Sequence, residues 1–263
     1  MSLLWRNHLR ISLCADRLVL AGYARGLRPG KPKGNVMPVQ VLPNAEEWRG
    51  AVDALPEVLN AHKNHDVSVV IADQFVRYVI LPWNAALKTD AQWMTLARHR
   101  LTAVHGAAAA GWDIKLTETA PNGPRLACAV DRELIQELEA KFVAADAKLV
   151  SVQPFLVAAF NKMRSGILST IGSASCWLVI EEPGRLTLAF IQRGVWVAVR
   201  SRRSDNRWRE MLPEIIERES AFLALSEPCT RVIVCTQGTF DTQMHEAFRT
   251  QAVSYRELAL AWA

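Results

Sequence analysis

Glu181 and Glu182 are the two residues whose type and position come nearest to an acid–base pair. They follow the run 176–180, whose apolar and β-branched residues predict a strand. Neighbouring side chains on a strand point to opposite faces, so these carboxylates cannot flank one substrate as acid and base. We therefore expect no catalytic pair at this position.

The histidines and cysteines contain no motif for metal binding or nucleophilic catalysis. No two of the six histidines have a zinc-helix spacing such as HExxH, and the five cysteines contain no CxxC pair. Four of the cysteines fall inside predicted strands, which favours buried, reduced thiols. The sequence also lacks a GxSxG elbow and a Walker A loop. We expect no metal, no cofactor and no catalytic residues, and hence no enzyme.

Length and composition are those of a folded globular protein. The chain has 263 residues, of which 50% are apolar, enough to build one large or two ordinary domains. No stretch reaches about eighteen uninterrupted apolar residues, and the N-terminus lacks the pattern of a signal peptide. We therefore expect a cytoplasmic chain.

Basic residues are unevenly distributed, although the formal net charge is only +5. The early cluster is Arg25, Arg28, Lys31 and Lys33, and the late cluster is Arg200, Arg202, Arg203, Arg207 and Arg209. Such clusters meet nucleic acid or the anionic inner leaflet of a membrane, or they form solvated loops without a partner. No aromatic residues interleave them for base stacking and no DNA- or RNA-binding signature is present, so we expect no nucleic-acid partner.

Two three-stranded meanders, one opening each half of the chain, indicate a duplicated architecture. Each consists of apolar runs rich in Val and Ile and bounded by Gly, Pro or Asp. The predicted strands are 10–14, 17–23 and 36–42 in the first half, and 176–180, 185–191 and 195–199 in the second. A helical pattern follows each meander, so we predict an α/β fold with mixed sheets.

The remaining elements divide the chain into two domains. Between the meanders, the pattern predicts a helix capped by Asn44 and ending near residue 60, strands at 66–72 and 75–81, a helix capped by Thr89, strands at 112–117 and 125–130, a helix from Asp131 to about Ala145, and a strand at 149–152. The elements from the strand at 75–81 to the helix that starts at Asp131 make a strand-helix-strand-strand-helix insert, about residues 75–148. This insert interrupts a first domain of residues 1–164.

A Ser- and Gly-rich joint at 165–175 separates the second domain, residues 175–263. After its meander we predict a helix at 206–225, a strand at 231–235, a helix near 242–250 and a strand at 252–255.

Five segments are informative in their order and spacing: FVRYVILP at 75–82, WMTLARHR at 93–100, LACAVD at 126–131, KLVSV at 148–152 and FLVAAF at 155–160. In these segments the chain resembles the PilM family of type IV pilus assembly proteins, the cytoplasmic part of GspL from type II secretion, and MshI-like pilus biogenesis proteins. The resemblance spans nearly the whole chain. It implies a duplicated actin-like (RNase H-like) fold with a small inserted subdomain.

The resemblance also locates three turns that hold the nucleotide in nucleotide-binding actin-like proteins, and each departs here from the phosphate-binding pattern. The first, 12–17, has no glycine, so Cβ atoms fill the space that a phosphate needs. The second, 180–185, places two carboxylates and a proline where N–H donors face the anion. The third, 235–239, keeps only Gly238. We expect no useful binding of ATP.

By resemblance, the chain is expected to be a non-catalytic scaffold in a type IV pilus or type II secretion platform. It would bind the cytoplasmic tail of a bitopic inner-membrane protein in a groove near the insert, as PilM binds PilN, or contact an assembly ATPase, as GspL does. Attachment to the membrane would come from that partner, so the chain would be peripheral to the inner membrane.

For the partner surface we select aromatic and arginine residues of the insert, since Tyr, Trp and Arg dominate interface energetics. The selected residues are Phe75, Arg77, Tyr78, Trp83, Trp93 and Arg100. The spacing of Phe75 and Trp93 also fits core positions, whereas Arg77 and Trp83 favour the surface.

Two other functions stay open at this point. One is an active actin-like ATPase, or a sugar-kinase relative, with unusual phosphate loops, which nucleotide binding and turnover would reveal. The other is a peripheral membrane or nucleic-acid module that uses the late basic cluster. Binding of that kind weakens steeply as salt rises.

Overall fold

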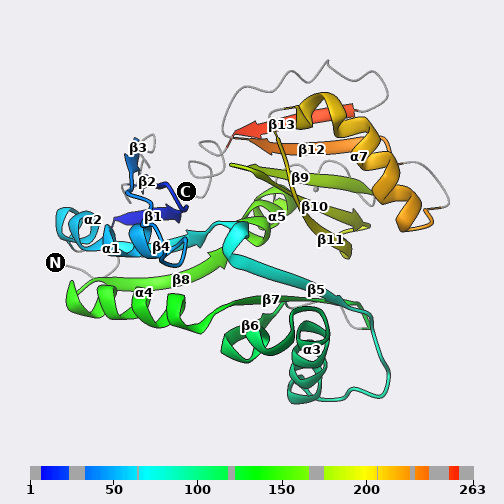
Figure 1. The fold of residues 1–263 in the computed structure, drawn as a ribbon, viewed down its shortest axis with the longest axis horizontal. Coiled ribbons are helices and arrows are strands. Elements are labelled where there is room, and N and C mark those ends of the chain that lie inside the picture. Colours follow the sequence, from blue (N-terminus) through cyan, green and yellow to red (C-terminus); the bar gives the residue numbers. More distant parts are fainter. Residues whose placement is uncertain are drawn as a thin grey trace.

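The fold is described from a computed structural model (Figure 1). It describes residues 7–23, 33–63, 65–117, 122–165, 175–205, 207–225, 229–236 and 249–254, with side chains for all of these except 33, 163–165 and 249–254. Several sequence predictions lie outside these residues: Arg25, Arg28 and Lys31 of the early cluster, Gly238 of the third turn, most of the joint at 165–175, and most of the helix near 242–250.

The first sheet contains the first predicted meander. Its five strands, in spatial order, are β3 (Lys33–Pro38), β2 (Arg17–Tyr23), β1 (His8–Leu13), β4 (Asp66–Ile71) and β8 (Lys148–Pro154). β1 pairs antiparallel with β2 and parallel with β4, so the meander and the later strands form one mixed sheet.

The second sheet repeats this arrangement. Its strands, in spatial order, are β11 (Val195–Arg203), β10 (Arg185–Gln192), β9 (Cys176–Glu182), β12 (Arg231–Thr236) and β13 (Arg249–Ser254). β9 occupies the place of β1, since it pairs antiparallel with β10 and parallel with β12. The predicted duplication of an α/β unit is confirmed.

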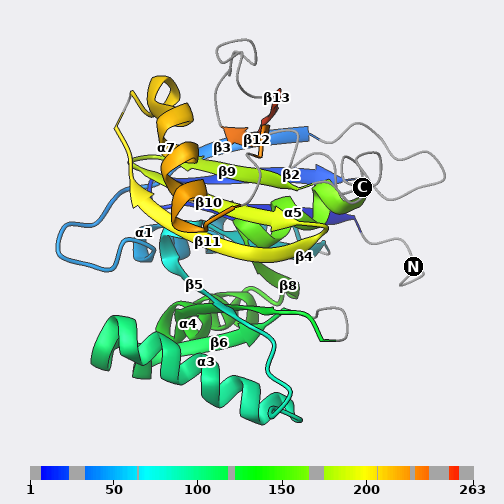
Figure 2. The same cartoon turned by 90° about the vertical axis from the view of Figure 1, so that its right-hand side faces the viewer.

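Helix α5 (Phe155–Ser165) lies between the two sheets and joins their cores (Figures 1 and 2). On β9, Leu178 and Ile180 belong to the large core that includes Leu156 of α5. Trp177 of the same strand faces the opposite way and packs in a second core beneath α7 (Trp208–Phe222). Because both faces of β9 are covered, its residues 176–180 are all apolar rather than alternating.

The insert is a three-stranded antiparallel sheet covered on one face by helix α3 (Asp90–His105). Its strands, in spatial order, are β5 (Val76–Leu81), β7 (Arg125–Asp131) and β6 (Trp112–Leu116). Trp93, Leu101 and Ile114 build a small core between the helix and the sheet. Thr89 caps α3 as predicted, in a capping box with Gln92.

Helix α4 (Arg132–Ala144) leads the chain out of the insert and back to the first domain. Asp131 caps it as predicted, accepting a hydrogen bond from the backbone N–H of Glu133. Its apolar face packs in the large core with the first sheet rather than in the small core of the insert. It lies there beside two short helices, α1 (Arg49–Asp53) and α2 (Leu55–Ala61). The domain boundaries at residues 164 and 175 stay predictions.

The helix predicted to start at Asn44 starts later. Asn44 has a left-handed φ of 62° in a turn, and the first helix begins at Arg49 without a side-chain cap. A second short helix then begins at Leu55, with Pro56 in its first turn, where the missing N–H of proline is tolerated. Asparagine adopts left-handed turns as readily as it caps helices, which explains this error.

Strand β11 is longer than predicted. It continues past Val199 because the antiparallel ladder with β10 extends until Arg203 lies opposite Arg185. Arg200, Arg202 and Arg203 of the late cluster therefore belong to an edge strand, not to a solvated loop.

Candidate functional site

The first turn, between β1 and β2, is closed by its own residues. The backbone N–H of Cys14 donates to the carbonyl of Arg17 at 3.1 Å. The guanidinium of Arg17 donates to Asp16 Oδ2 at 2.9 Å. The Cys14 side chain is buried, and burial raises the pKa of its thiol to about 12. This turn is a tight hairpin whose polar groups bond one another.

The second turn, between β9 and β10, sends a carboxylate across to the first domain. Glu182 is buried, and its Oε1 and Oε2 accept the backbone N–H groups of Asp73 at 2.9 Å and of Gln74 at 3.1 Å. Both donors belong to the 3₁₀ turn Asp73–Phe75 that follows β4. Successive backbone N–H groups of this kind bind anions in many proteins. Here a carboxylate of the second domain occupies them.

Asp73 forms hydrogen bonds with residues of the insert, of α5 and of the second domain. Its side chain is fully buried, and Oδ1 accepts a hydrogen bond from the hydroxyl of Tyr78 on β5. The same oxygen accepts the backbone N–H of Leu156, at the start of α5, at 2.9 Å. The backbone N–H of Asp73 is the one that Glu182 holds. One residue at the end of β4 is therefore bonded to the insert, to α5 and to the second domain.

The two buried carboxyl groups at this junction resist ionisation. Burial raises the pKa of Asp73 to about 7, against the hydrogen bonds from Tyr78 and Leu156 and the charge of Arg185. Burial, and then the charge of Asp73, raises the pKa of Glu182 to about 8, against the two backbone N–H bonds and Arg185. The junction therefore keeps a proton at neutral pH.

Glu181 points away from this junction, as alternation along a strand predicts. Its Oε2 accepts a hydrogen bond from the hydroxyl of Thr236, at the end of β12, at 2.6 Å. It also lies 3.9 Å from Nη2 of Arg209. The prediction that Glu181 and Glu182 cannot face one substrate is confirmed.

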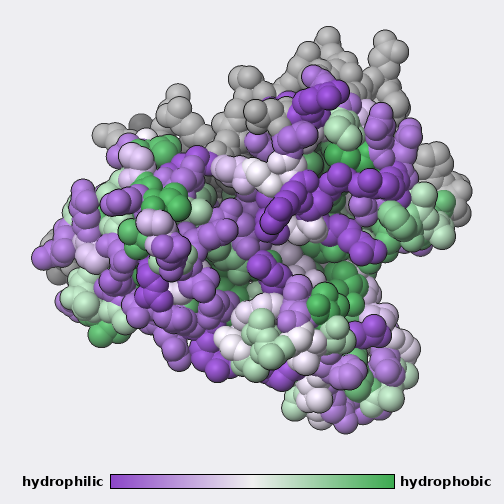
Figure 3. Space-filling model, in the orientation of Figure 1, coloured by the Kyte–Doolittle hydropathy of each residue, from purple (hydrophilic) through white to green (hydrophobic). Residues whose placement is uncertain are grey.

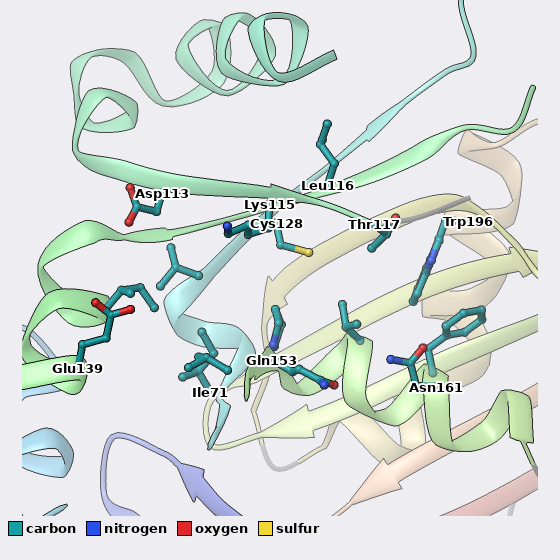
Figure 4. Close-up of a pocket in the computed structure, with 16 residues that line it drawn as sticks. Ile71, Asp113, Lys115, Leu116, Thr117, Cys128, Glu139, Gln153, Asn161 and Trp196 are labelled. Carbon is teal, nitrogen blue, oxygen red and sulfur yellow. The ribbon is translucent and has the colours of Figure 1, made fainter. Parts of the chain in front are cut away.

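A groove of about 640 Å³ lies between the insert and the first domain, on the face of the inserted sheet that α3 leaves uncovered (Figure 4). Lys115 and Cys128 reach into it from the insert. Trp196 of β11 stands at one end, so the second domain contributes to its wall. On the opposite side Figure 4 shows Ile71, Gln153 and Asn161, with Glu139 of α4 at the other end.

The groove has an apolar floor and a polar edge. The apolar lining residues include Val130, Ile135, Val152, Val157 and Phe160, and the polar ones include Asp113, Lys115, Glu139, Gln153 and Asn161. The rings of Phe160 and Trp196 contact each other, with centroids 4.3 Å apart. In the space-filling view, hydrophobic residues gather where the insert approaches β11 (Figure 3). Apolar walls with a few polar groups are typical of ligand-binding sites.

A smaller cavity of about 290 Å³ lies on the other side of β5, and residues of all three parts line it, among them Trp48, Phe75, Arg77 and Arg185. The Arg77 guanidinium donates to the carbonyls of Gln74 at 2.9 Å and of Val76 at 3.1 Å. Burial, and then the charge of Arg185, lowers the pKa of Arg77.

The six residues selected from the sequence do not form one surface, and none of them lines the 640 Å³ groove. Phe75 and Arg77 line the smaller cavity, and Tyr78 bonds Asp73. Trp93 is buried in the core of the insert, which confirms the core interpretation for this residue. Trp83, 47% exposed, and Arg100 lie on the surface. Their part in partner binding stays a prediction.

Sequence reasoning missed Asp73 and the groove residue Trp196. Asp73 had one signal, since it directly follows a buried strand, and functional residues gather at the carboxyl ends of strands in open α/β sheets. Trp196 had none, because its place in the groove depends on how the second domain sits against the insert.

Two kinds of feature are absent from the described part of the chain. No group of three or more His, Cys, Asp or Glu side chains there could hold a metal ion. None of the helices described is long and apolar enough to cross a membrane.

Solved structures share this arrangement of two sheets. A PilM–PilN type IV pilus biogenesis complex is similar with a TM-score of 0.65 and 14% identity, over 95% of this chain and 89% of that one. The cytoplasmic domain of EpsL, an inner-membrane component of the type II secretion system of Vibrio cholerae, is similar with a TM-score of 0.62 and 8% identity, over 97% and 93%. A Bacteroides thetaiotaomicron protein with an actin-like ATPase fold and unknown function is similar with a TM-score of 0.58 and 12% identity, over 89% of this chain and 83% of that one.

The chain has an actin-like fold. The fold expected from the sequence is thereby confirmed, and the two kinds of assembly protein that its segments resemble are among the structures similar to it. At these identities the likeness concerns the actin-like fold alone. No protein-family model matches the sequence, and no curated protein does.

Proposed function

We propose that this actin-like chain is a non-catalytic scaffold at the cytoplasmic face of the inner membrane, in a type IV pilus or type II secretion platform. Its groove would bind the cytoplasmic tail of a bitopic membrane partner. The observation that carries the proposal is the groove itself, whose walls come from the insert, the first domain and the second domain. The similar structures give the context, since one is a complex of PilM with PilN and one is a type II secretion component.

The chemistry of the groove suits a short peptide. Its volume of about 640 Å³ falls in the range of about 300–1,000 Å³ for ligand pockets. Apolar side chains of a tail would fill the floor beside Val157 and Phe160, while Lys115 and Glu139 would meet charged or polar groups. The groove is too small for a folded domain, so an assembly ATPase would use another surface.

The closed phosphate turns support a non-catalytic role. The two backbone N–H groups after β4 already hold the Glu182 carboxylate, so a phosphate arriving there would meet a group that repels it. In the first turn, the Arg17 side chain is paired with Asp16.

Calorimetric titration tests this function. The ligands are Mg-ATP and synthetic cytoplasmic tails of the bitopic membrane proteins encoded beside this chain. We expect a tail to bind and Mg-ATP not to bind. Val157→Glu, which places a carboxylate on the groove floor, should weaken the tail about tenfold or more, a loss of about 1.4 kcal/mol.

Val104→Glu is the matched control. Val104 is an exposed helical valine on α3, on the far side of the inserted sheet, so this variant should bind the tail like the parent chain. Micromolar binding of Mg-ATP with turnover, and no bound tail, would instead favour the actin-like ATPase.

A further inference from the structure

We propose that Asp73 and Glu182 form a proton-controlled latch. A proton carried by this pair holds the second domain, α5 and the insert on the first domain, and its loss loosens this junction. The part of this inference that concerns ligand binding in the groove rests on the proposed function. The junction itself is a property of the chain alone.

The bonds of the latch connect every part of the molecule. Glu182 reaches the 3₁₀ turn from the second domain, across 109 residues of sequence. Tyr78 reaches Asp73 from the insert, and the N–H of Leu156 reaches it from α5. No described residue places a cation within ion-pair distance of either carboxyl group, so neither negative charge is directly neutralised.

The geometry indicates which atom carries the proton. Both oxygens of Glu182 accept backbone N–H groups, and Oδ1 of Asp73 accepts two hydrogen bonds. Oδ2 of Asp73 is buried and has no hydrogen-bond partner among the described residues. Protonation at Oδ2 therefore breaks no bond of the latch, whereas protonation elsewhere would compete with one.

The other titratable groups around Asp73 and Glu182 do not change charge near neutral pH. Tyr78 on β5 and Cys128 on β7 have their pKa values raised by burial and by Asp73. Burial likewise raises the pKa of Cys235 on β12. It also raises the pKa of Cys14, in the turn after β1, where the charge of Glu182 adds to the effect. These side chains stay neutral.

Arg185 on β10 is the cation that acts on the pair. It lowers the pKa of both carboxyls without outweighing their burial. Arg77 on β5 lies near Arg185, which lowers the pKa of Arg77 as well. The Arg77 guanidinium keeps its charge at neutral pH despite this shift, so it adds no titration of its own there.

The latch lies directly behind the groove. Ile71, two residues before Asp73, lines the groove, and Pro154 and Val157 line it on either side of Leu156. Cys128, another lining residue, pairs with Tyr78 in the β5–β7 ladder. A change in the bonds of Asp73 would therefore reach groove walls on four elements: β4, β7, β8 and α5.

The direction of the pH effect follows from the raised pKa values. Exposed Asp and Glu ionise near pH 4, whereas the latch pair titrates at about 7 and about 8. The closed junction therefore binds more protons than an open one. The proton's stabilisation of the closed junction is complete below about pH 4, and it is lost progressively as the pH rises from there to the raised pKa values.

The test measures hydrogen exchange of the Asp73 and Gln74 amides in the full chain, from about pH 4 to about pH 9, after correction for intrinsic exchange. Both amides donate to Glu182, so their exchange reports opening directly. In the parent chain, protection should fall about tenfold per pH unit between about pH 4 and the raised pKa values of the pair, and it should level off above them. D73N keeps a neutral side chain with the Oδ1 acceptor and leaves burial as the main cause of the raised pKa of Glu182, so its protection should change with pH less than that of the parent chain.

Two glutamate variants complete the experiment. E182Q presents an amide N–H₂ to a backbone N–H, so it should lose protection at every pH. E181Q is the matched control, since Glu181 bonds Thr236 on the other side of the strand, and it should behave like the parent chain. Protection of the parent chain that is independent of pH, or E182Q as protected as the parent, would overturn the latch.

A peptide titration separates the two proposals. If a synthetic tail of a co-encoded membrane protein binds, its affinity for the parent chain should fall as the pH rises, and its affinity for D73N should fall less. A pH-dependent amide signal with no bound tail would uphold the latch and refute the proposed function. A bound tail with no pH-dependent opening would do the reverse.

Discussion

Glu182 illustrates what a single residue's type can and cannot reveal. The sequence identified two carboxylates beside a Pro-Gly turn, and alternation correctly separated their directions. The sequence could not show that the backbone N–H groups facing Glu182 belong to residues 109 and 108 positions away. From the sequence, the Glu182 carboxylate was expected to repel a bound anion. In the structure, this carboxylate itself accepts the hydrogen bonds of the two backbone N–H groups.

Gly50 gives a prediction at the residue scale. A Cβ at this position would lie 2.2 Å from the carbonyl oxygen of Gln40, so the backbone would have to move. Gly50→Ala should lower the free energy of unfolding by about 1–3 kcal/mol, the usual cost of overpacking. Gly111→Ala is the control, because nothing lies within 4 Å of a Cβ there. Chemical denaturation of both variants measures the difference, and equal stabilities would contradict this contact.

The elements were predicted best where local signals agree. Long apolar runs gave the strands of both meanders, and Thr89 and Asp131 gave the starts of α3 and α4. The signals failed where tertiary packing decides: Asn44 took a turn conformation instead of capping a helix, and β11 continued because β10 offered partners. The groove could not be predicted at all, since its walls come from segments between residue 71 and residue 196.

Helix α3 gives a prediction at the scale of the element. Its capping box joins Thr89 and Gln92 and satisfies backbone N–H groups at the start of the helix. Thr89→Ala should cost about 1 kcal/mol and increase hydrogen exchange in the first turn of α3. Thr95→Ala, in the same helix, removes an exposed hydroxyl that bonds only the carbonyl of Ala91 and should change stability by less than about 0.5 kcal/mol. If Thr95→Ala proved as costly as Thr89→Ala, the cap would not be the stabilising feature.

At the scale of the whole molecule, two copies of one sheet topology are joined by α5, and the insert leans on both. Contacts between β5 and β11 bring the insert to the second domain, and Trp196 of β11 reaches the groove. A ligand in the groove therefore contacts all three parts. The hydrogen bonds around Asp73 join the same three parts on the side away from the groove. In the proposed latch, this arrangement would couple the width of the groove to the bonds of Asp73.

The charges around the late basic cluster bear on whether the chain binds an anionic membrane by electrostatic attraction alone. Residues 200–219 contain six arginines but also five carboxylates. Arg200 lies 4.0 Å from Glu219, and Arg207 lies 3.4 Å from Glu210. Each basic residue near an anionic surface contributes only about 1 kcal/mol, so a surface this close to neutral attracts it weakly.

We therefore expect the chain alone not to co-sediment with vesicles that contain anionic phospholipid at about 150 mM salt, where charges are screened beyond about 8 Å. Vesicles that display a bound tail peptide should recover it, because the partner supplies the attachment. The double variant R202E/R203E reverses two charges of edge strand β11 and should leave this recovery unchanged. The opposite outcome is binding to bare vesicles that weakens with salt and that this variant abolishes. Only attraction through the arginines depends on both salt and their charge, so this outcome would make the chain a peripheral membrane module instead.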